Sequence, residues 1–503
     1  MQLIDLAHTF DEVRATRSRK AKVTAVAASL RAATPDEVPV VAAYLGGALT
    51  QRRTGVGWRS LTDLPAPAES PSLTVREVDR AFADLAVVSG AGSQTERRRQ
   101  LGAVFGRATV EEQQLLRGLV TGEVRSGALE GVLVEGIAAA FEVAAPVVRR
   151  AVMLAGSAPF VAAVAATEGA EGLTAIGLEV GRPVQPMLAA SAPDLATALE
   201  TVGLPCLVDG KLEGIRIQVH RRGDELSVWS RSLDDLTGRF PELIALVRSL
   251  PAESFVLDGE ALLLDADGRP RSFQETASRS MTRTESALVM TPYFFDVLHL
   301  DGRDLLDAPA TGRSEALLAL VPQAYTVPRL LAGTAEQAAT FQAQVLADGH
   351  EGVVVKSLAS TWEAGRRGSG WVKVKPRHTL DLVVLAVEWG SGRRRGLLSN
   401  IHLGARDPAG DGFVMLGKTF KGMTDEVLAW QTERFLGLET HREGHVVHVR
   451  PEQVVEIAFD GLQRSTRYPG GLALRFARVL GYRADKSADQ ADTIDDVRRL
   501  AGP

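Results

Sequence analysis

The chain has 503 residues, which predicts about three domains at roughly 150 residues each. Its apolar and charged fractions, 45% and 24%, are typical of soluble globular proteins. The single cysteine, Cys206, excludes an internal disulfide framework and a Cys-rich zinc site. A net charge of −5 gives no global attraction to nucleic acid, so such binding must come from local basic patches.

The first residues predict no targeting segment. MQLIDLAHTFDEVR places acids early and has no apolar signal-peptide core. No apolar stretch approaches the roughly 18 residues that a membrane span needs. We therefore expect an intracellular, cytoplasmic protein without a membrane partner.

Residues 1–180 are predicted to form an all-α domain. Apolar residues recur at three- and four-residue spacing, which indicates helices, in the segments AKVTAVAASLRAA (21–33), VREVDRAFADLAVV (75–88), EEQQLLRGLVTGEV (111–124) and VLVEGIAAAFEVAAPVVRRAVMLAG (132–156). Clusters of Gly and Pro separate these segments. The Pro-rich segment Gly181–Pro193 marks the first predicted domain boundary.

Residues 181–384 are predicted to form an antiparallel β/α domain. CLVDGKLEGIRIQVHRRGDELSVWS (206–230) reads as two strands joined by a turn at 222–224, SFVLDGEALLLDADGRP (254–270) reads as a hairpin, and TPYFFDVLHLDG (291–302) reads as a strand. Residues 385–503 alternate short strands with loops, which favours a small β-barrel with a short helix or tail at its end. The expected fold class is therefore a multidomain α+β protein.

Five stretches of the middle segment place charged residues in or beside apolar strands. They are KLEGIR (211–216), SR (230–231), LDGEAL (257–262), EGVVVK (351–356) and WVKVK (371–375). One such charge is most often a solvated strand end, but five in one domain favour a common site. The cations are Lys211, Arg216, Arg231, Lys356, Lys373 and Lys375, and the carboxylates are Glu213, Asp258, Glu260 and Glu351.

This combination of charges suits a nucleoside triphosphate with magnesium. Arg and Lys bind phosphate oxygens, and Mg²⁺ is usually held by one or two carboxylates together with phosphates and water. The chain has no GxxxxGK[ST] phosphate loop, so the strand residues themselves must hold the polyphosphate.

Lys211 is the candidate nucleophile. A free lysine has a pKa of about 10.4 and is a poor nucleophile at neutral pH, but neighbouring cations and a metal lower that pKa. Such an amine could attack an α-phosphorus, release pyrophosphate and hold the nucleotide as a phosphoamide. The structural alternative, that Lys211 only pairs with Glu213 or Glu260, stays open from the residues alone.

The ordered set KLEGIR, SR, LDGEAL, FFD, EGVVVK and WVKVK resembles the covalent nucleotidyltransferases, and most closely the ATP-dependent DNA ligases. The resemblance implies that Lys211 carries AMP and that Arg216 and Arg231 contact AMP or the 5′-phosphate of a nick. It further implies that Glu260 binds ribose or metal, that Phe295 stacks on adenine and that Glu351 binds metal. Lys373 and Lys375 would contact the α-phosphate, and the supporting residues would be Glu213, Asp258, Lys356 and Asp485.

RFARVLGYRADKSADQADT (475–493) resembles the last motif of the same family. The resemblance implies an OB-fold domain on which Arg483, Asp485 and Lys486 orient the pyrophosphate leaving group. Arg393, Arg394 and Arg395 lie in a loop of this domain and either meet a phosphate backbone or form a solvated tip.

GLVTGEVRSGALEGVLVEGIAAAF (118–141) resembles the DNA-binding domain of larger ATP-dependent ligases. Arg125 precedes a helix there, and a helix N-terminus can receive a phosphate. Arg97, Arg98 and Arg99 are weaker candidates. Residues 1–180 hold 19 Lys and Arg against 20 Asp and Glu, so the domain has no net positive charge. DNA binding would therefore depend on one basic face of the domain.

One position departs from the family pattern, because Glu213 stands where the nucleophile motif usually has aspartate. The resemblance implies an ATP-dependent DNA ligase that uses Mg²⁺ and acts on nicked duplex DNA as a monomer in repair, replication or recombination. An RNA ligase, a capping-type nucleotidyltransferase and a non-catalytic DNA-binding scaffold are the alternatives. An NAD-dependent ligase is less favoured, because one cysteine cannot build the four-cysteine zinc site of that class.

Overall fold

The computed structural model describes residues 1–51, 54–124, 129–271, 273–281, 289–363, 367–376, 378–410 and 412–501. The chain divides into two compact units. The first unit comprises residues 1–190, 201–334 and 354–372, and the second comprises residues 191–200, 335–353 and 373–503. The three domains expected at 1–180, 181–384 and 385–503 therefore remain a prediction.

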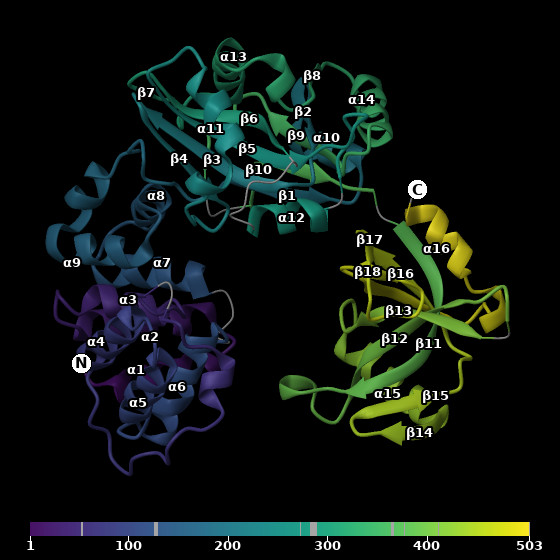
Figure 1. Cartoon of the computed structure of the whole chain (residues 1–503), viewed down its shortest axis with the longest axis horizontal. Helices are drawn as coiled ribbons and strands as arrows, with labels where there is room; N and C mark the ends of the chain where they lie inside the picture. The colour runs from purple at the N-terminus through teal and green to yellow at the C-terminus, as the bar shows by residue number, and fades with distance from the viewer. Residues whose placement is uncertain are drawn as a thin grey trace. The chain divides into compact units, whose positions relative to one another are not determined.

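The N-terminal part of the first unit is helical, as predicted (Figure 1). Its helices are α1 (Leu3–Ala15), α2 (Arg19–Ala32), α3 (Val38–Leu45), α4 (Val75–Val87), α5 (Ser93–Phe105), α6 (Val110–Thr121), α7 (Leu129–Ala140), α8 (Ala145–Ala155) and α9 (Ala158–Ala175), with a 3₁₀ turn η1 (Trp58–Leu61). Thr74 and Thr109 begin α4 and α6 with reciprocal capping boxes to Glu77 and Glu112, which satisfy N–H groups that each helix start leaves unpaired.

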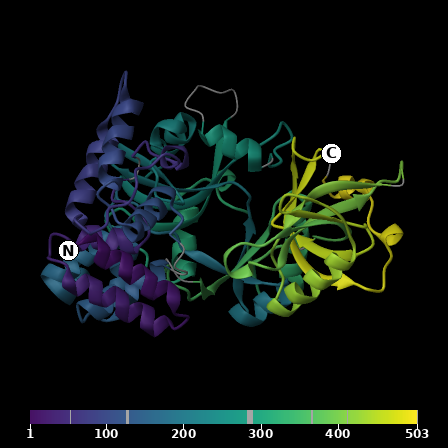
Figure 2. The ribbon, with the colours of Figure 1, turned by 90° about the horizontal axis from the view of Figure 1, so that it is seen from below.

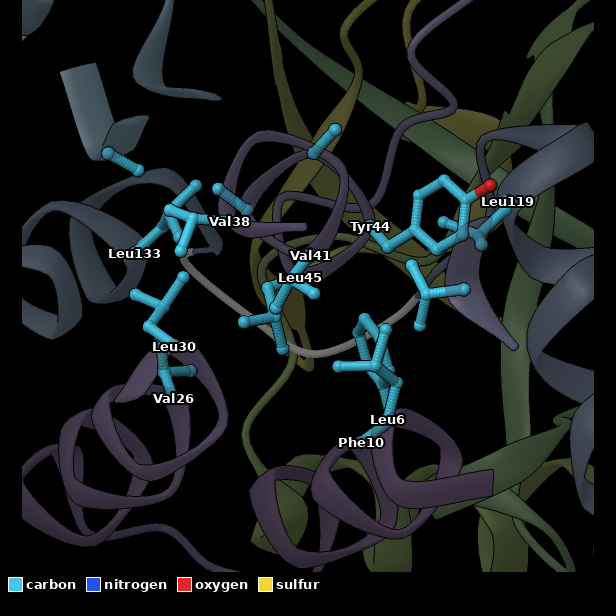
Figure 3. Close-up of a cluster of buried hydrophobic side chains, with 14 of the residues drawn as sticks. Leu6, Phe10, Val26, Leu30, Val38, Val41, Tyr44, Leu45, Leu119 and Leu133 are labelled. Atoms are coloured by element: carbon cyan, nitrogen blue, oxygen red, sulfur yellow. The ribbon is translucent and has the colours of Figure 1, made fainter. Parts of the chain in front are cut away.

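Apolar side chains from α1, α2, α3, α6 and α7 meet in one core. Figure 3 shows this cluster, with the labelled residues Leu6, Phe10, Val26, Leu30, Val38, Val41, Tyr44, Leu45, Leu119 and Leu133. Gly136 of α7 lies so close to α2 that an added Cβ would come within 2.3 Å of the Val26 side chain. The predicted helical segment 132–156 is in fact two helices, because the chain turns between α7 and α8 and Glu142 adopts a φ of 55°.

Two five-stranded sheets form the central part of the chain. One has the strand order β1 (Leu188–Ala192), β10 (Arg367–Val374), β9 (Gly352–Ser357), β2 (Cys206–Lys211) and β8 (Arg329–Ala332). The other has the order β4 (Glu225–Ser230), β3 (Ile215–Arg222), β5 (Ser254–Leu263), β6 (Met290–Leu300) and β7 (Arg303–Asp304). The helices of this part of the sequence are α10 (Leu195–Val202), α11 (Pro241–Arg248), α12 (Phe273–Met281), α13 (Ala310–Leu320) and α14 (Ala335–Ala347), and the 3₁₀ turns are η2 (Thr237–Arg239) and η3 (Gln323–Tyr325).

The segment 206–230 corrects the prediction of two strands, because it contains three. β2 ends at Lys211 and β3 begins at Ile215, and the two strands belong to different sheets. The residues between them therefore carry the chain from one sheet to the other. The first of the charged stretches identified in the sequence lies at this crossover.

The C-terminal part is β-rich, and Figure 2 shows its green and yellow strands gathered together. A seven-stranded sheet contains β13 (Phe413–Thr419), β12 (Leu398–Arg406), β11 (His378–Trp389), β15 (Val446–Val449) and β14 (Glu439–Glu443), while β16 (Val454–Phe459) pairs with β11 and with β19 (Arg478–Arg483). β17 (Gly461–Arg464) pairs with β18 (Leu472–Arg475), and α15 (Asp425–Gly437), α16 (Ile494–Ala501), η4 (Gly392–Arg394) and η5 (Ala488–Gln490) complete this part. No pairing among the described strands closes this sheet into a barrel, and the domain is OB-fold-like.

Candidate active site

Lys211 is the last residue of β2 and is half-buried. The crossover that follows leaves no room for a side chain at Gly214, where an added Cβ would lie 2.5 Å from the Ala261 carbonyl oxygen of β5. Glycine permits this close backbone approach. Lys211 thereby lies near Glu260 of β5, and Glu213 lies half-buried in the same crossover.

Glu260 interacts with both Lys211 and Arg216. Burial raises the pKa of its carboxyl group to about 7, although the charges of Lys211 and Arg216 and a 3.2 Å hydrogen bond from the Gly214 N–H act in the opposite direction. Arg216 and Glu260 are paired residues in the β3–β5 ladder, so both face the same side of the sheet.

Arg216 is held in a fork by Asp258. Its Nε and Nη2 atoms donate to the two carboxylate oxygens at 3.0 and 2.6 Å, and Nη1 donates to the Met187 carbonyl oxygen at 2.6 Å. Asp258 is 1% exposed, and burial raises its pKa against the attraction of Arg216. Arg216 is therefore fixed in position by a buried carboxylate.

A second buried carboxylate, Asp209, lies two residues before Lys211 on β2. It accepts two hydrogen bonds from Arg329, at 2.6 and 2.7 Å, and forms an ion pair of 2.6 Å with the Lys356 ammonium. Burial alone would raise the pKa of Asp209, but the two cations hold it below its usual range. Lys356, expected beside the nucleotide, is thus 3% exposed and neutralised by Asp209.

Phe295 is surrounded by cations and one other aromatic ring. The Arg216 guanidinium carbon lies 5.4 Å and the Lys356 ammonium 5.2 Å from the Phe295 ring centroid, within cation–π range. Trp371 packs against Phe295 edge to face at 6.0 Å and lies 4.1 Å from the Lys356 ammonium. The residue predicted to stack on adenine therefore lies among residues of three of the predicted motifs.

A third buried pair joins Asp296 to Arg313. Arg313 is 1% exposed and donates from Nε to Asp296 at 2.8 Å and from Nη1 to the carbonyl oxygens of Ala308 and Ser360. The buried carboxylates of this region thus hold the buried cations, and Asp209 is shared by Arg329 and Lys356. Arg231, by contrast, is exposed in the loop after β4 and forms no ion pair with an acid among the described residues.

Glu351 and Lys375 belong to the second unit, where they form an ion pair. The glycine after Glu351 has a φ of 147°, and a Cβ there would lie 2.2 Å from the Val374 carbonyl oxygen. This glycine lets the start of β9, which follows Glu351, approach the end of β10, which precedes Lys375. Lys373 is half-buried on β10.

The cations of the last motif converge on Asp381 of β11. Arg483 donates to Asp381 at 3.1 and 3.4 Å, and the Lys486 ammonium lies 2.5 Å from the same carboxylate. Asp485 accepts two further hydrogen bonds from Arg483 at 2.8 and 2.6 Å, which raises the pKa of Arg483 and lowers the pKa of Asp485 to about 2.

Family comparisons agree with these motifs. Residues 186–375 match the family described as ATP dependent DNA ligase domain, residues 394–486 match the ATP dependent DNA ligase C terminal region, and residues 62–138 match the DNA ligase N terminus. The chain is 64% identical over 506 residues to the "Probable DNA ligase" of Nocardioides sp. strain JS614, with 99% of each chain covered. It belongs to the ATP-dependent DNA ligase family.

Two further comparisons support this membership and the fold. The "Probable DNA ligase" of Beutenbergia cavernae is 62% identical over 513 residues, with 100% of both chains covered. The solved structure named Pmar-Lig_PreS3 aligns with a TM-score of 0.63 at 17% identity and covers 95% of this chain and 99% of its own, which supports the fold. The ligase has no helix long and apolar enough to span a membrane among its described residues.

Two exposed phenylalanines lie among basic side chains in the C-terminal region of the ligase. Phe476 is 61% exposed, with the Lys421 ammonium 5.4 Å and the Arg475 guanidinium 5.7 Å from its ring centroid. Phe420 is 55% exposed, and its carbonyl oxygen accepts a 2.7 Å hydrogen bond from Arg394. Arg393 and Arg395 flank Arg394 and are exposed. Sequence reasoning identified the arginines but missed the aromatic residues.

The N-terminal arginine candidates have different environments. Arg97 is half-buried and donates to the Val88 carbonyl oxygen, Arg99 pairs with Glu96 at 2.6 Å, and Arg98 is exposed. Arg125 lies outside the described residues. Sequence reasoning also missed two buried aspartates that hold predicted cations, Asp209 and Asp381, and the buried pair of Asp296 with Arg313. Their only signal was an acidic residue inside an apolar strand segment.

Proposed function

We propose that this chain seals nicks in duplex DNA with ATP through a lysyl-AMP intermediate on Lys211. The observation that carries the proposal is a half-buried lysine at the crossover between two sheets, beside Glu260 and Arg216. Membership of the ATP-dependent DNA ligase family supports the reaction class.

In the first step, Lys211 Nζ loses a proton and attacks the α-phosphorus of ATP. A P–N bond forms, the bond to the β-phosphate oxygen breaks, and pyrophosphate leaves with the electron pair. Arg216, which is paired with Glu260 in the β3–β5 ladder, would bind a phosphate oxygen of the nucleotide. Phe295 supplies an aromatic face for adenine.

In the later steps, the 5′-phosphate of the nick attacks the same phosphorus and forms a phosphoanhydride, while the P–N bond breaks and Lys211 regains its proton. The 3′-hydroxyl then attacks the 5′-phosphorus, loses its proton and releases AMP. Each step exchanges one bond at phosphorus, so positioning and charge stabilisation provide most of the rate.

Arg483 and Lys486 would assist the first step by binding the leaving pyrophosphate. Both side chains are about one third exposed, so each could bind a phosphate oxygen while it stays paired with the buried Asp381. Lys373 and Lys375 would bind the α-phosphate. Arg231, which is exposed, would meet the 5′-phosphate of the nick.

The residues fit a role for Mg²⁺. Burial raises the pKa of the Glu260 carboxyl group to about 7, and a divalent cation bound beside it would favour the ionised form. Glu351 would be a second ligand once its pair with Lys375 opens. When bound, Mg²⁺ would neutralise phosphate charge and stabilise the leaving oxygen.

DNA would contact both the helical region and the C-terminal region. Exposed aromatic rings among arginines and lysines, as at Phe420 and Phe476, suit a surface that meets nucleic acid without reading a sequence. Arg125 would contribute a phosphate contact.

We further propose three domains, at residues 1–180, 181–384 and 385–503. We also propose that the enzyme is a monomer in the cytoplasm and acts in DNA repair, replication or recombination.

The experiment that tests this function is a sealing assay with the purified full chain, ATP and Mg²⁺. Duplexes with one nick, flanked by DNA or by RNA strands, separate a DNA ligase from an RNA ligase or a capping-type enzyme. We expect sealing of the nicked DNA and none by Lys211→Ala, while Lys20→Ala, which removes an exposed lysine, seals normally. A wild-type protein that binds nicked DNA but neither seals it nor takes up AMP would be the non-catalytic scaffold.

A further inference from the structure

We propose that the β14–β15 hairpin binds one divalent transition-metal ion, of the Zn²⁺ class, through His441, Glu443 and His448. One donor atom from each of these three side chains lies within 4.8 Å of the others. None of them belongs to the nucleotide-binding motifs or to the basic surface described above, so the inference is independent of the proposed function.

The ladder brings the three side chains to one face of the hairpin. His441 of β14 is paired with His448 of β15, and Glu443 lies two residues beyond His441, on the same face. Arg442, between them, points to the other face, where it pairs with Glu439 and lies over the Trp389 ring. The site is thus built by strand register.

The distances suit a shared cation better than direct hydrogen bonds. The Nε2 atoms of His441 and His448 lie 3.8 and 3.7 Å from the two carboxylate oxygens of Glu443, beyond hydrogen-bond range. In a tetrahedral site with metal–ligand distances of about 2.0–2.2 Å, donor atoms lie roughly 3.3 Å apart. A shared ion must lie in the plane of both imidazole rings, so the two stacked rings turn out of their parallel arrangement when they bind it, which their partly exposed positions allow.

Thr440 fixes the ring nitrogen of His441 that faces the site. Its hydroxyl group donates to the His448 carbonyl oxygen at 3.1 Å, so its oxygen is left to accept from His441 Nδ1 at 3.2 Å. In neutral His441 the proton then lies on Nδ1, and the Nε2 lone pair faces Glu443. Metal-binding histidines are commonly oriented by such a hydrogen bond on the other ring nitrogen.

The two histidine rings are stacked with their centroids 4.3 Å apart and their planes at 5°. Two imidazoles and one carboxylate form a ligand set that suits zinc and the later first-row metals, whereas Mg²⁺ prefers oxygen ligands alone. The ion bound here would therefore differ from the Mg²⁺ proposed for catalysis. Water would complete its coordination.

The test is a calorimetric titration of the tag-free full chain with Zn²⁺ alone, in buffer containing excess Mg²⁺. We expect one equivalent of Zn²⁺ to bind to the wild type. His441→Ala and His448→Ala should each weaken binding at least tenfold, and the double variant should abolish it. His8→Ala is the matched control, since it removes an exposed histidine outside the hairpin, and should bind as the wild type does.

Two substitutions keep the test decisive if a histidine variant unfolds. Glu443→Gln, at a side chain that is 72% exposed, should weaken Zn²⁺ binding about tenfold. Thr440→Val retains all three ligands and should weaken binding severalfold through loss of ring orientation. A wild type that binds no Zn²⁺, or a Glu443→Gln variant that binds it with unchanged affinity and stoichiometry, would overturn the proposal.

Discussion

Arg216 in the central region and Arg483 in the C-terminal region both bind an aspartate through a two-pronged hydrogen bond, yet they do so in different surroundings. The Arg216 side chain is 14% exposed and its partner Asp258 is 1% exposed, whereas Asp485, which binds Arg483, is 65% exposed. Removing one member of a buried pair leaves an uncompensated charge in a medium that solvates it poorly. An exposed pair can exchange its carboxylate for a phosphate at little cost.

The comparison separates two uses of the same residue types. The buried ion pairs near Lys211 are part of the framework, since their cations already neutralise buried carboxylates, one of which Arg329 and Lys356 share. The partly exposed cations of the C-terminal region remain available to a ligand. Substitutions in the first group should therefore affect stability, and substitutions in the second group should affect individual reaction steps.

The largest effect is expected for Asp209→Ala, which leaves Arg329 and Lys356 buried without their counter-charge. The free energy of unfolding should fall by about 3–5 kcal/mol, measured by urea denaturation. Asp485→Ala, which removes an exposed aspartate, should leave the unfolding midpoint almost unchanged. Equal losses in the two variants would remove the distinction between the regions.

Next in size is the effect of pH on His220. Burial lowers the pKa of its imidazole to about 3, from about 6.5 when unfolded, and its two nitrogens bond to the Gly181 N–H and the Gln218 side chain. Below pH 6.5 the unfolded chain binds a proton that the folded chain does not, so stability is lost as pH falls. Between pH 6.5 and 5 this contribution is about 2 kcal/mol.

His220→Gln should make the free energy of unfolding depend less on pH between pH 6.5 and 5, whatever its effect on stability at pH 7. His8→Gln, which replaces an exposed histidine, should leave the slope as in the wild type. Urea denaturation at several pH values between 7 and 5 provides the measurement. A slope unaltered by His220→Gln would mean that other groups cause it.

Arg483→Ala should slow self-adenylation roughly tenfold or more, because the leaving pyrophosphate loses a cation. Sealing of a nick that already carries AMP should be unaffected, since that step releases no pyrophosphate. The two rates are measured separately with ATP and with pre-adenylated DNA. Arg442→Ala, a control at another exposed arginine of the same region, should change neither. An equal fall in both rates for Arg483→Ala would contradict a role confined to the first step.

The smallest effect is expected for Arg395→Ala on the exposed loop. Affinity for nicked DNA should fall severalfold, and the slope of log affinity against log salt should decrease by about 1, as for the loss of one phosphate contact. Self-adenylation should be unchanged. Arg499→Ala, at an exposed arginine of α16, is the control. If Arg395→Ala leaves the slope of log affinity against log salt unchanged, the arginine loop makes no phosphate contact and is a solvated tip.

Local sequence patterns predicted the helical N-terminal region, the strands that carry Asp258, Glu260 and Phe295, and the β-rich C-terminal region. These features depend on periodicity within a few residues. The change of sheet after Lys211 was not predicted, because apolar residues recur at Leu212 and Ile215 and the segment resembles one continuous strand. Which sheet a strand joins depends on partners far away in the sequence.

The ion-pair partners were missed for a similar reason. Asp209 and Arg329 are 120 residues apart, and Asp381 and Arg483 are 102 residues apart. Sequence alone identified the cations as a set and attributed them all to the nucleotide. The structure shows that Arg216 and Lys356 are also required to neutralise buried acids.

The central claim is that Lys211 carries the nucleotide. The most direct measurement is to incubate the protein with Mg²⁺ and ATP labelled at the α-phosphate, after pyrophosphate has removed any AMP already bound, and to map the label on the digested chain. We expect one acid-labile label on the peptide that contains Lys211 and no label on the Lys211→Ala variant. Label on another residue, or undiminished labelling of Lys211→Ala, would contradict the claim.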